Sequence, residues 1–195
     1  MREDHSDGQA ARSRRRVLAA QNVSRMCLVC GSDNGFGLHG RFFELAPQGD
    51  EAAEPGQSRA LGRCELLGVF TTREEHQSYP GRLHGGIAAA ALDETIGRAI
   101  VIAHPETWGV TVELTVRYRR PLRLDRELRV LGRITRDGSR LFEGSGEILL
   151  DDGSVAVEAK GKYLKMRLEN IAAEGMDEWE WFADERERPD WIELG

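Results

Sequence analysis

The chain has 195 residues, of which 40% are hydrophobic and 31% are charged, a balance typical of one soluble globular domain with tails. Its net charge of −6 argues against general nucleic-acid binding. No uncharged apolar run has the roughly 20 residues of a membrane helix, and we expect neither a membrane partner nor a signal peptide. Three cysteines, an odd number, argue against a disulfide framework. We therefore expect a cytoplasmic protein.

We expect three parts along the chain. Residues 1–36 form an N-terminal arm with a Cys-x-x-Cys loop, 37–168 the main domain, and 169–195 an acidic tail. Within the arm, Arg12 to Met26 could form a helix. The tail holds three of the four tryptophans, Trp179, Trp181 and Trp191. Two interpretations of the tail remain open, a solvated acidic segment or docking on the body, because indole rings are costly to leave in water.

The middle of the chain predicts strands. Two candidates come first, Leu38 to Ala46 and Ala60 to Thr72. Apolar and polar residues then alternate from Val110 to Tyr118, which indicates a half-buried strand. Asp-Gly turns separate the next stretches, which are Leu128 to Ile134, Leu141 to Leu150 and Val155 to Tyr163. We interpret the order as two strands, a helix and three hairpin-linked strands, which predicts an α+β fold with one antiparallel sheet around one helix.

The predicted helix begins at Gly85-Gly86 and ends before Pro105. Apolar residues lie around nearly its whole circumference, which implies burial on most sides. Glu94 and Arg98 are four residues apart and can pair on a solvent-facing stripe. Asp93 has only alanine, isoleucine and glycine at the neighbouring helical positions. Its carboxylate therefore has no partner within its own helix.

The start of this helix and Asp93 together suggest chemistry. The first-turn N–H groups of a helix have no intrahelical partner and lie at the positive end of the dipole, so they can hold an oxyanion. Asp93 follows Gly86 by seven residues, about 10 Å along the axis. A carboxylate near an oxyanion hole suits acyl transfer to water, as general base or as nucleophile. Alternatively, Asp93 bonds a neighbouring backbone group and the glycines form only a tight turn.

The triplet His84-Gly85-Gly86 followed by Leu92-Asp93 resembles the signature of hotdog-fold thioesterases of the PaaI type. The resemblance covers roughly residues 60–165. It implies a hotdog fold, an antiparallel sheet wrapped around one long central helix, which dimerises through a continuous sheet. It further implies an acyl-CoA substrate, no cofactor and no metal. Each active site would lie between subunits of a homodimer or homotetramer, with Asp93 of one chain near the glycines of another.

The resemblance also assigns further site residues. Asp93 would be the catalytic carboxylate, and Gly85 with Gly86 would supply the oxyanion N–H groups. A Ser or Thr at the position of Thr111 helps hold the attacking water in some relatives. Ser78 stands where some relatives carry an Asn that polarises the thioester, so it departs from the pattern. His84 could be a base, but we favour a role in orienting the loop.

Two other sets of side chains leave alternatives open. Cys27 and Cys30 form a lone Cys-x-x-Cys, and His39 with Cys64 could in principle complete a zinc site, but the spacing matches no standard pattern. We favour buried thiols. Six arginines are either solvated cations or a patch that steers the coenzyme A phosphates: Arg117, Arg119, Arg120, Arg123, Arg126 and Arg129.

Three functions are considered. The first is hydrolysis of acyl-CoA thioesters. The second is a hotdog module that binds acyl-CoA without hydrolysing it, which the replaced Asn position and the long tails favour. The third is an enoyl-CoA hydratase or dehydratase, in which His84 and Asp93 would form the acid–base pair, although the His-Gly-Gly spacing does not resemble that class.

Overall fold

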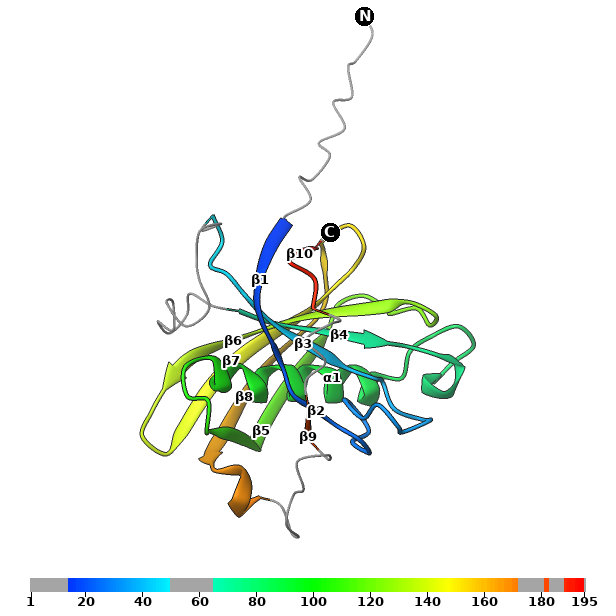
Figure 1. The fold of residues 1–195 in the computed structure, drawn as a ribbon. Helices are drawn as coiled ribbons and strands as arrows, with labels where there is room; N and C mark the ends of the chain where they lie inside the picture. Colours follow the sequence, from blue (N-terminus) through cyan, green and yellow to red (C-terminus); the bar gives the residue numbers. More distant parts are fainter. Residues whose placement is uncertain (1–13, 50–64, 172–180, 183–187, 195) are drawn as a thin grey trace, which may run out of the picture.

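The computed structural model describes residues 14–49, 65–171, 181–182 and 188–194 (Figure 1). Eight strands form one sheet in the order β10-β1-β3-β4-β6-β7-β8-β5, with every neighbouring pair antiparallel. The long strands of the sheet are β1 (Arg14–Gln21), β3 (Arg41–Leu45), β4 (Glu65–Thr71), β5 (Trp108–Tyr118), β6 (Glu127–Asp137), β7 (Leu141–Leu149) and β8 (Val155–Met166). The shorter elements are β2 (Val23–Ser24), β9 (Trp181–Phe182), β10 (Trp191–Glu193) and the 3₁₀ turns η1 (Glu74–His76), η2 (Ala99–Ile102) and η3 (Leu168–Asn170).

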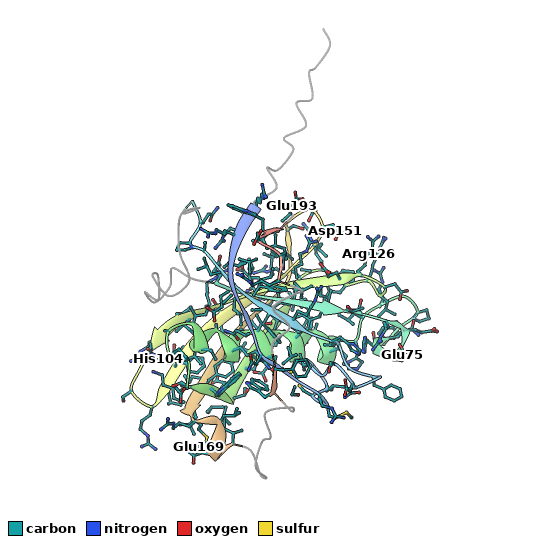
Figure 2. All side chains as sticks on the ribbon, viewed as in Figure 1. Glu75, His104, Arg126, Asp151, Glu169 and Glu193 are labelled. Carbon is teal, nitrogen blue, oxygen red and sulfur yellow. The ribbon has the colours of Figure 1, made fainter. Side chains whose placement is uncertain are left out.

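One long helix, α1 (Gly85–Arg98), lies across one face of this sheet and contacts β4, β5, β6, β7 and β8 (Figure 1). Figure 2 labels Glu75 beyond the start of α1 and His104 beyond its end. The α+β fold predicted from the sequence, one antiparallel sheet around one helix, is confirmed. Four long strands follow α1: β5, which contains the predicted strand from Val110 to Tyr118, and then β6, β7 and β8, the three strands of the predicted hairpins. No helix within the described ranges is long and apolar enough to span a membrane.

The helix packs close to the sheet because the side chains on the two facing surfaces are small. Its buried face includes Ala88, Ala91 and Ile96. On the facing strands, a Cβ at Gly132 would lie 2.9 Å from the Thr95 carbonyl oxygen, and one at Gly144 would lie 2.5 Å from Ile96 Cγ2. These separations are shorter than van der Waals contact, so glycine is required at both strand positions for the helix to lie where it does.

The segment before the main domain is a strand and not the predicted helix. Residues 14–21 form β1, which pairs with β3 on one side and β10 on the other. Val17 and Leu18 are adjacent and both buried, because a β-bulge at Leu18 interrupts the regular alternation of the strand. Burial within the sheet stabilises the strand, although the weak apolar pattern of the segment favours a helix. Met26 lies beyond the strand and is exposed.

The described parts of the tail dock on the body. β10 pairs with β1, and β9 pairs with β2. The Trp181 ring packs edge-on against Trp108 with centroids 4.8 Å apart, and the Arg14 guanidinium lies 4.5 Å from the centre of the Trp191 ring. Trp179 lies outside the described residues. Docking, one of the two interpretations of the tail, therefore holds for Trp181 and Trp191.

The tail also covers the sheet face opposite α1. Phe43, Leu67 and Leu131 point away from the helix, and they pack with Leu194 in a second buried cluster. The domain boundaries at residues 36 and 168 stay a prediction, but these contacts join the terminal segments to the central sheet.

The Glu94–Arg98 pair forms as predicted, with Arg98 Nε 2.6 Å from Glu94 Oε1. The prediction that it lies on a solvent-facing stripe is wrong, because Arg98 is only 3% exposed. Its Nη1 donates to the Asn22 carbonyl oxygen at 2.6 Å, and its guanidinium lies 4.3 Å from the centre of the Phe42 ring and 5.0 Å from that of Trp181. The terminal segments bury this pair, and their carbonyl and aromatic groups offset part of the desolvation cost.

The close packing of α1 on β7 predicts that one added methyl group on the strand destabilises the fold. Gly144→Ala should lower the free energy of unfolding by about 1–3 kcal/mol, because the new Cβ would overlap Ile96 on α1. The measurement is urea unfolding followed by circular dichroism. The matched control is Gly35→Ala, where a Cβ meets nothing within 4 Å. Equal stability of the two variants would contradict the close approach of α1 to β7.

Candidate active site

Asp93 lies on the side of α1 that faces β5 and β8, and it receives hydrogen bonds from both strands. Thr111 Oγ1 lies 2.9 Å from Oδ1 and 3.0 Å from Oδ2 of the carboxylate. The Tyr163 hydroxyl donates to Oδ1 at 3.1 Å. The carboxylate that lacks a partner in its own helix is therefore held by two hydroxyl groups from the sheet.

A β-bulge brings Thr111 to this position. Thr111 pairs with Tyr163 and Glu113 pairs with Lys162, so Val112 has no partner on β8. Residues directly opposite each other in an antiparallel pair share a face of the sheet. Thr111 and Tyr163 consequently both face α1, whereas Val112 is 61% exposed. The predicted unbroken alternation from Val110 to Tyr118 is wrong at this point, because the extra residue reverses the phase of the strand.

The environment of Asp93 raises its pKa above the usual range for aspartate. Burial is the main cause, since it disfavours the charged form, and the neighbouring Glu94 carboxylate acts in the same direction. The hydrogen bonds from Thr111 and Tyr163 lower the pKa and partly oppose this shift. A half-buried carboxylate with a raised pKa is a stronger base than an exposed one, which suits proton abstraction from water.

Tyr163 was not among the predicted site residues. Its side chain is fully buried, and burial, followed by the negative charge of Asp93, raises the pKa of its hydroxyl, so it stays a hydrogen-bond donor. The sequence carried a signal for it, because Tyr163 occupies the apolar phase of the alternating β8 pattern. A tyrosine on a buried face needs a partner for its hydroxyl group, and the unpartnered Asp93 was the available acceptor.

At the start of α1, His84 is the N-cap residue. Its ring Nδ1 accepts a hydrogen bond from the Gly86 N–H at 2.9 Å. Its carbonyl oxygen accepts from the N–H groups of Ile87 and Ala88. The N–H of Gly85 has no partner within the described part of the chain. Gly85 therefore offers the free first-turn donor, and the His84 ring fixes the turn around it.

The space around Gly85 leaves room for a ligand. A Cβ added at Gly85 would make only ordinary contact with the Tyr118 ring, at 3.5 Å, so the fold itself does not require glycine there. The Tyr118 hydroxyl donates to the Gly85 carbonyl oxygen at 2.7 Å and holds the peptide in place. A cavity of about 230 Å³ adjoins Gly85, and Arg119 and Arg120 also line it.

The predicted site residues form two groups within one chain. Asp93 and Thr111 lie together, and His84, Gly85 and Gly86 lie together. Gly85 and Asp93 are eight residues apart on the same helix, about 12 Å along its axis. Ser78 belongs to neither group. It is exposed in the loop before α1, and its N–H donates to the Arg82 carbonyl oxygen.

Most of the six arginines pair with nearby carboxylates at the surface. Arg119 donates twice to Glu158, at 3.0 Å from Nε and 2.7 Å from Nη2. Arg126 lies 3.3 Å from Asp151, and Figure 2 labels both residues. The remaining pairs are Arg117 with Glu158, Arg120 with Asp152 and Arg129 with Glu127. Exposed pairs with a single contact are weak, so these arginines remain available to an anionic ligand, whereas two hydrogen bonds hold Arg119 more firmly.

The Cys-x-x-Cys loop lies beside α1. Ligand atoms of Cys27, Cys30 and Glu94 lie within 4.8 Å of one another. His39, one of the two residues considered as further zinc ligands, is not in this group, because its Nε2 lies 3.0 Å from the Asn34 carbonyl oxygen. Cys64, the other, lies outside the described residues.

Known proteins resemble this chain over its central part. Residues 80–157 match the sequence profile of the thioesterase superfamily. Mouse acyl-coenzyme A thioesterase 13 is 24% identical over 119 residues, which cover 57% of this chain and 84% of the mouse protein. The human protein of the same name is 26% identical over 115 residues, which cover 55% of this chain and 81% of the human protein.

A solved structure gives a further comparison. The crystal structure of a thioesterase superfamily protein superposes with a TM-score of 0.57 at 26% sequence identity. The match covers 73% of this chain and 64% of that protein, just under two thirds of its length. The sheet around α1, the His-Gly-Gly helix start and these relatives agree: the chain has the hotdog fold, and its residues 80–157 are similar to the thioesterase superfamily.

Proposed function

We propose that this protein hydrolyses acyl-CoA thioesters, as a thioesterase of the PaaI type. The observation that carries the proposal is Asp93, a half-buried carboxylate with a raised pKa that is oriented by Thr111 and Tyr163. The names of the mouse and human relatives supply the substrate class. The free N–H of Gly85 supplies the second element that thioester hydrolysis requires, a donor for the developing oxyanion.

The chemistry assigns a role to each group. Asp93 takes a proton from water, and the resulting hydroxide attacks the thioester carbonyl carbon. The carbonyl oxygen becomes an oxyanion, which accepts a hydrogen bond from the Gly85 N–H. The C–S bond then breaks, and the coenzyme A thiolate leaves. Thr111 and Tyr163 hold the carboxylate in one orientation, so no reorganisation is needed when it becomes charged or neutral. Attack by Asp93 itself through an anhydride is the alternative route.

The complete site in this proposal lies between two chains. Gly85 and Asp93 of one chain are too far apart along α1 to act on one carbonyl carbon. β5 is the last strand in the sheet order, and Val112 on it is 61% exposed. Pairing of β5 with β5 of a second copy would extend the sheet and place the two helices side by side. Asp93 of one chain would then face Gly85 of the other.

Coenzyme A recognition in this proposal uses the cavity beside Gly85. Arg119 and Arg120 line it, and guanidinium groups bind phosphates through paired N–H donors. The phosphates would replace the contact of Arg119 with Glu158 and the long, weak contact of Arg120 with Asp152.

One observation argues against a hydratase or dehydratase. Such an enzyme would need the His84 ring free for proton transfer, but the ring Nδ1 accepts a hydrogen bond from the Gly86 N–H at 2.9 Å and caps α1. A binding module that does not hydrolyse acyl-CoA remains the second candidate function. It would show stabilisation by acyl-CoA in a thermal melt without release of free thiol.

Replacement of the Asp93 carboxylate tests its proposed role as base or nucleophile. Asp93→Asn should lower kcat on acyl-CoA substrates by at least about 100-fold, because the amide cannot accept the proton from water. The measurement is release of free coenzyme A thiol over short, long and aryl acyl chains. Glu106→Gln, at an exposed loop position, is the control and should retain activity. Unchanged kcat in Asp93→Asn would exclude Asp93 as base or nucleophile.

The pH dependence of activity tests whether the hydroxyl groups that contact Asp93 lower its pKa. A general base acts when deprotonated, so activity should fall as the pH drops through the pKa of Asp93. Thr111→Val removes a hydrogen bond that lowers this pKa, and the acid limb of the kcat/KM profile should move to higher pH. Thr115→Val, on the same strand but without influence on the pKa of Asp93, should leave the limb in place. A shift to lower pH in Thr111→Val would contradict the assignment.

Mixed oligomers test the intersubunit site. Gly85→Phe, whose ring would fill the cavity beside the N–H, and Asp93→Asn should each be inactive alone and folded by circular dichroism. After coexpression, about a quarter of wild-type activity should return, because half of the dimers are mixed and each mixed dimer has one intact site. If all site groups came from one chain, the mixture would stay inactive.

A further inference from the structure

Cys27 and Cys30 lie outside the proposed hydrolytic site and have no role in it. They belong to the turn between β2 and β3, which packs beside the end of α1. Both are free thiols, with Cys27 half-buried and Cys30 buried. Their sulfur atoms lie within 4.8 Å of each other. Two sulfurs this close on one short turn can be joined with a small local movement.

The backbone of the turn is arranged around the sulfur of Cys27. The N–H groups of Val29 and Cys30 donate to it at 3.3 Å and 3.4 Å. A Cβ at Gly31 would lie 2.3 Å from the Cys27 carbonyl oxygen, so the turn can close only with glycine there. Hydrogen bonds from backbone N–H groups stabilise a thiolate, the reactive form of cysteine.

The two thiols differ in their acidity. The Cys30 thiol, together with the N–H groups of Cys30 and Val29, lowers the pKa of Cys27 to about 6, against the opposing effects of burial and Glu94. The hydrogen bond to Cys27 and burial raise the pKa of Cys30, against the opposing effect of the Arg98 charge. At neutral pH the pair therefore consists of a nucleophilic thiolate and a neighbouring thiol.

A buried cation accompanies the pair. Arg98 Nη2 donates to Cys30 Sγ at 3.2 Å, and Arg98 Nε bonds Glu94 at 2.6 Å. The Ser24 hydroxyl also lies near the pair, 4.0 Å from Cys30 Sγ. Arg98 can stabilise negative charge on Cys30 when this thiol loses its proton.

The same cation disfavours a metal ion. Cys27, Cys30 and Glu94 are three ligands where a structural zinc site needs four. The Arg98 guanidinium already bonds two of them, and its positive charge repels a second cation at this distance. The cluster therefore favours reactions of sulfur over coordination of a metal.

We propose that Cys27 and Cys30 are a reversible dithiol–disulfide pair that exchanges with small-molecule disulfides. The Cys27 thiolate attacks one sulfur of a disulfide RSSR, which forms a mixed disulfide and releases RS⁻. The Cys30 thiol then gives up its proton to RS⁻ and attacks Cys27 Sγ, which closes the protein disulfide and releases the second RS⁻. Two protein thiols are oxidised, and one small disulfide is reduced to two thiols.

The surroundings allow a small disulfide to approach. Cys27 is partly exposed, and the neighbouring Met26 and Leu28 are exposed. A cavity of about 410 Å³ borders Cys30 and is also lined by Ser32, His39 and Phe42.

The test uses the full chain with Cys64→Ser, which leaves Cys27 and Cys30 as the only cysteines. Treatment with oxidised glutathione should remove both titratable thiols and lower the mass by two hydrogens, and reduction should restore them. Adding Cys30→Ser should stop the reaction at a glutathione adduct on Cys27. Adding Cys27→Ser should leave Cys30 largely unreacted. Retention of both thiols in the Cys64→Ser protein, or equal reactivity of the two single thiols, would overturn the proposal.

A second measurement does not depend on the folding of variants. In the wild-type protein, the rate of Cys27 alkylation by iodoacetamide, followed by peptide mass spectrometry, should reach half its maximum near pH 6. An ordinary thiol would do so near about pH 8.5. A midpoint at the ordinary value would contradict the proposal. Stoichiometric zinc in the purified wild-type protein that protects Cys27 from alkylation would also overturn the proposal, because metal-bound thiolates would then explain the loop.

Discussion

The close approach of α1 to the sheet is the constraint on which the candidate site depends. Alanines on the helix and glycines such as Gly132 and Gly144 on the strands remove the side chains that would otherwise separate the two layers. This proximity brings the Asp93 carboxylate within reach of hydroxyl groups on the strands, and it removes enough water to raise the pKa of Asp93. The packing of the core and the chemistry of the site therefore have one cause.

The two ends of α1 have different functions in the proposed mechanism. The start of the helix presents the free Gly85 N–H, held by the His84 cap and the Tyr118 hydroxyl. The carboxylate lies two turns further on, beside the exposed edge of β5. A helix about 12 Å long between the two groups cannot bend to join them. The proposed second copy supplies the missing proximity without any change within either chain.

Sequence reasoning predicted the helix, the long strands and the position of Asp93, because helical burial and strand alternation leave periodic patterns. It missed the bulge at Val112, which reverses the phase of β5 without any change in composition. It also missed Tyr163 as the partner of Asp93, because strand pairing sets that contact across seventy residues of sequence. The N-terminal segment shows a weak helical pattern but forms a strand, because pairing with β3 and with β10 near the other end of the chain decides its structure.

The enclosure of Arg98 also orders events during synthesis of the chain. The N-terminal Asn22 and Cys30 emerge from the ribosome before the helix, but Trp181 emerges after all of the long strands. Domains begin to fold while synthesis continues. A nascent chain that has already assembled α1 and the sheet therefore still presents one side of this guanidinium to water, and its burial becomes complete only when the last segment of the chain has been made.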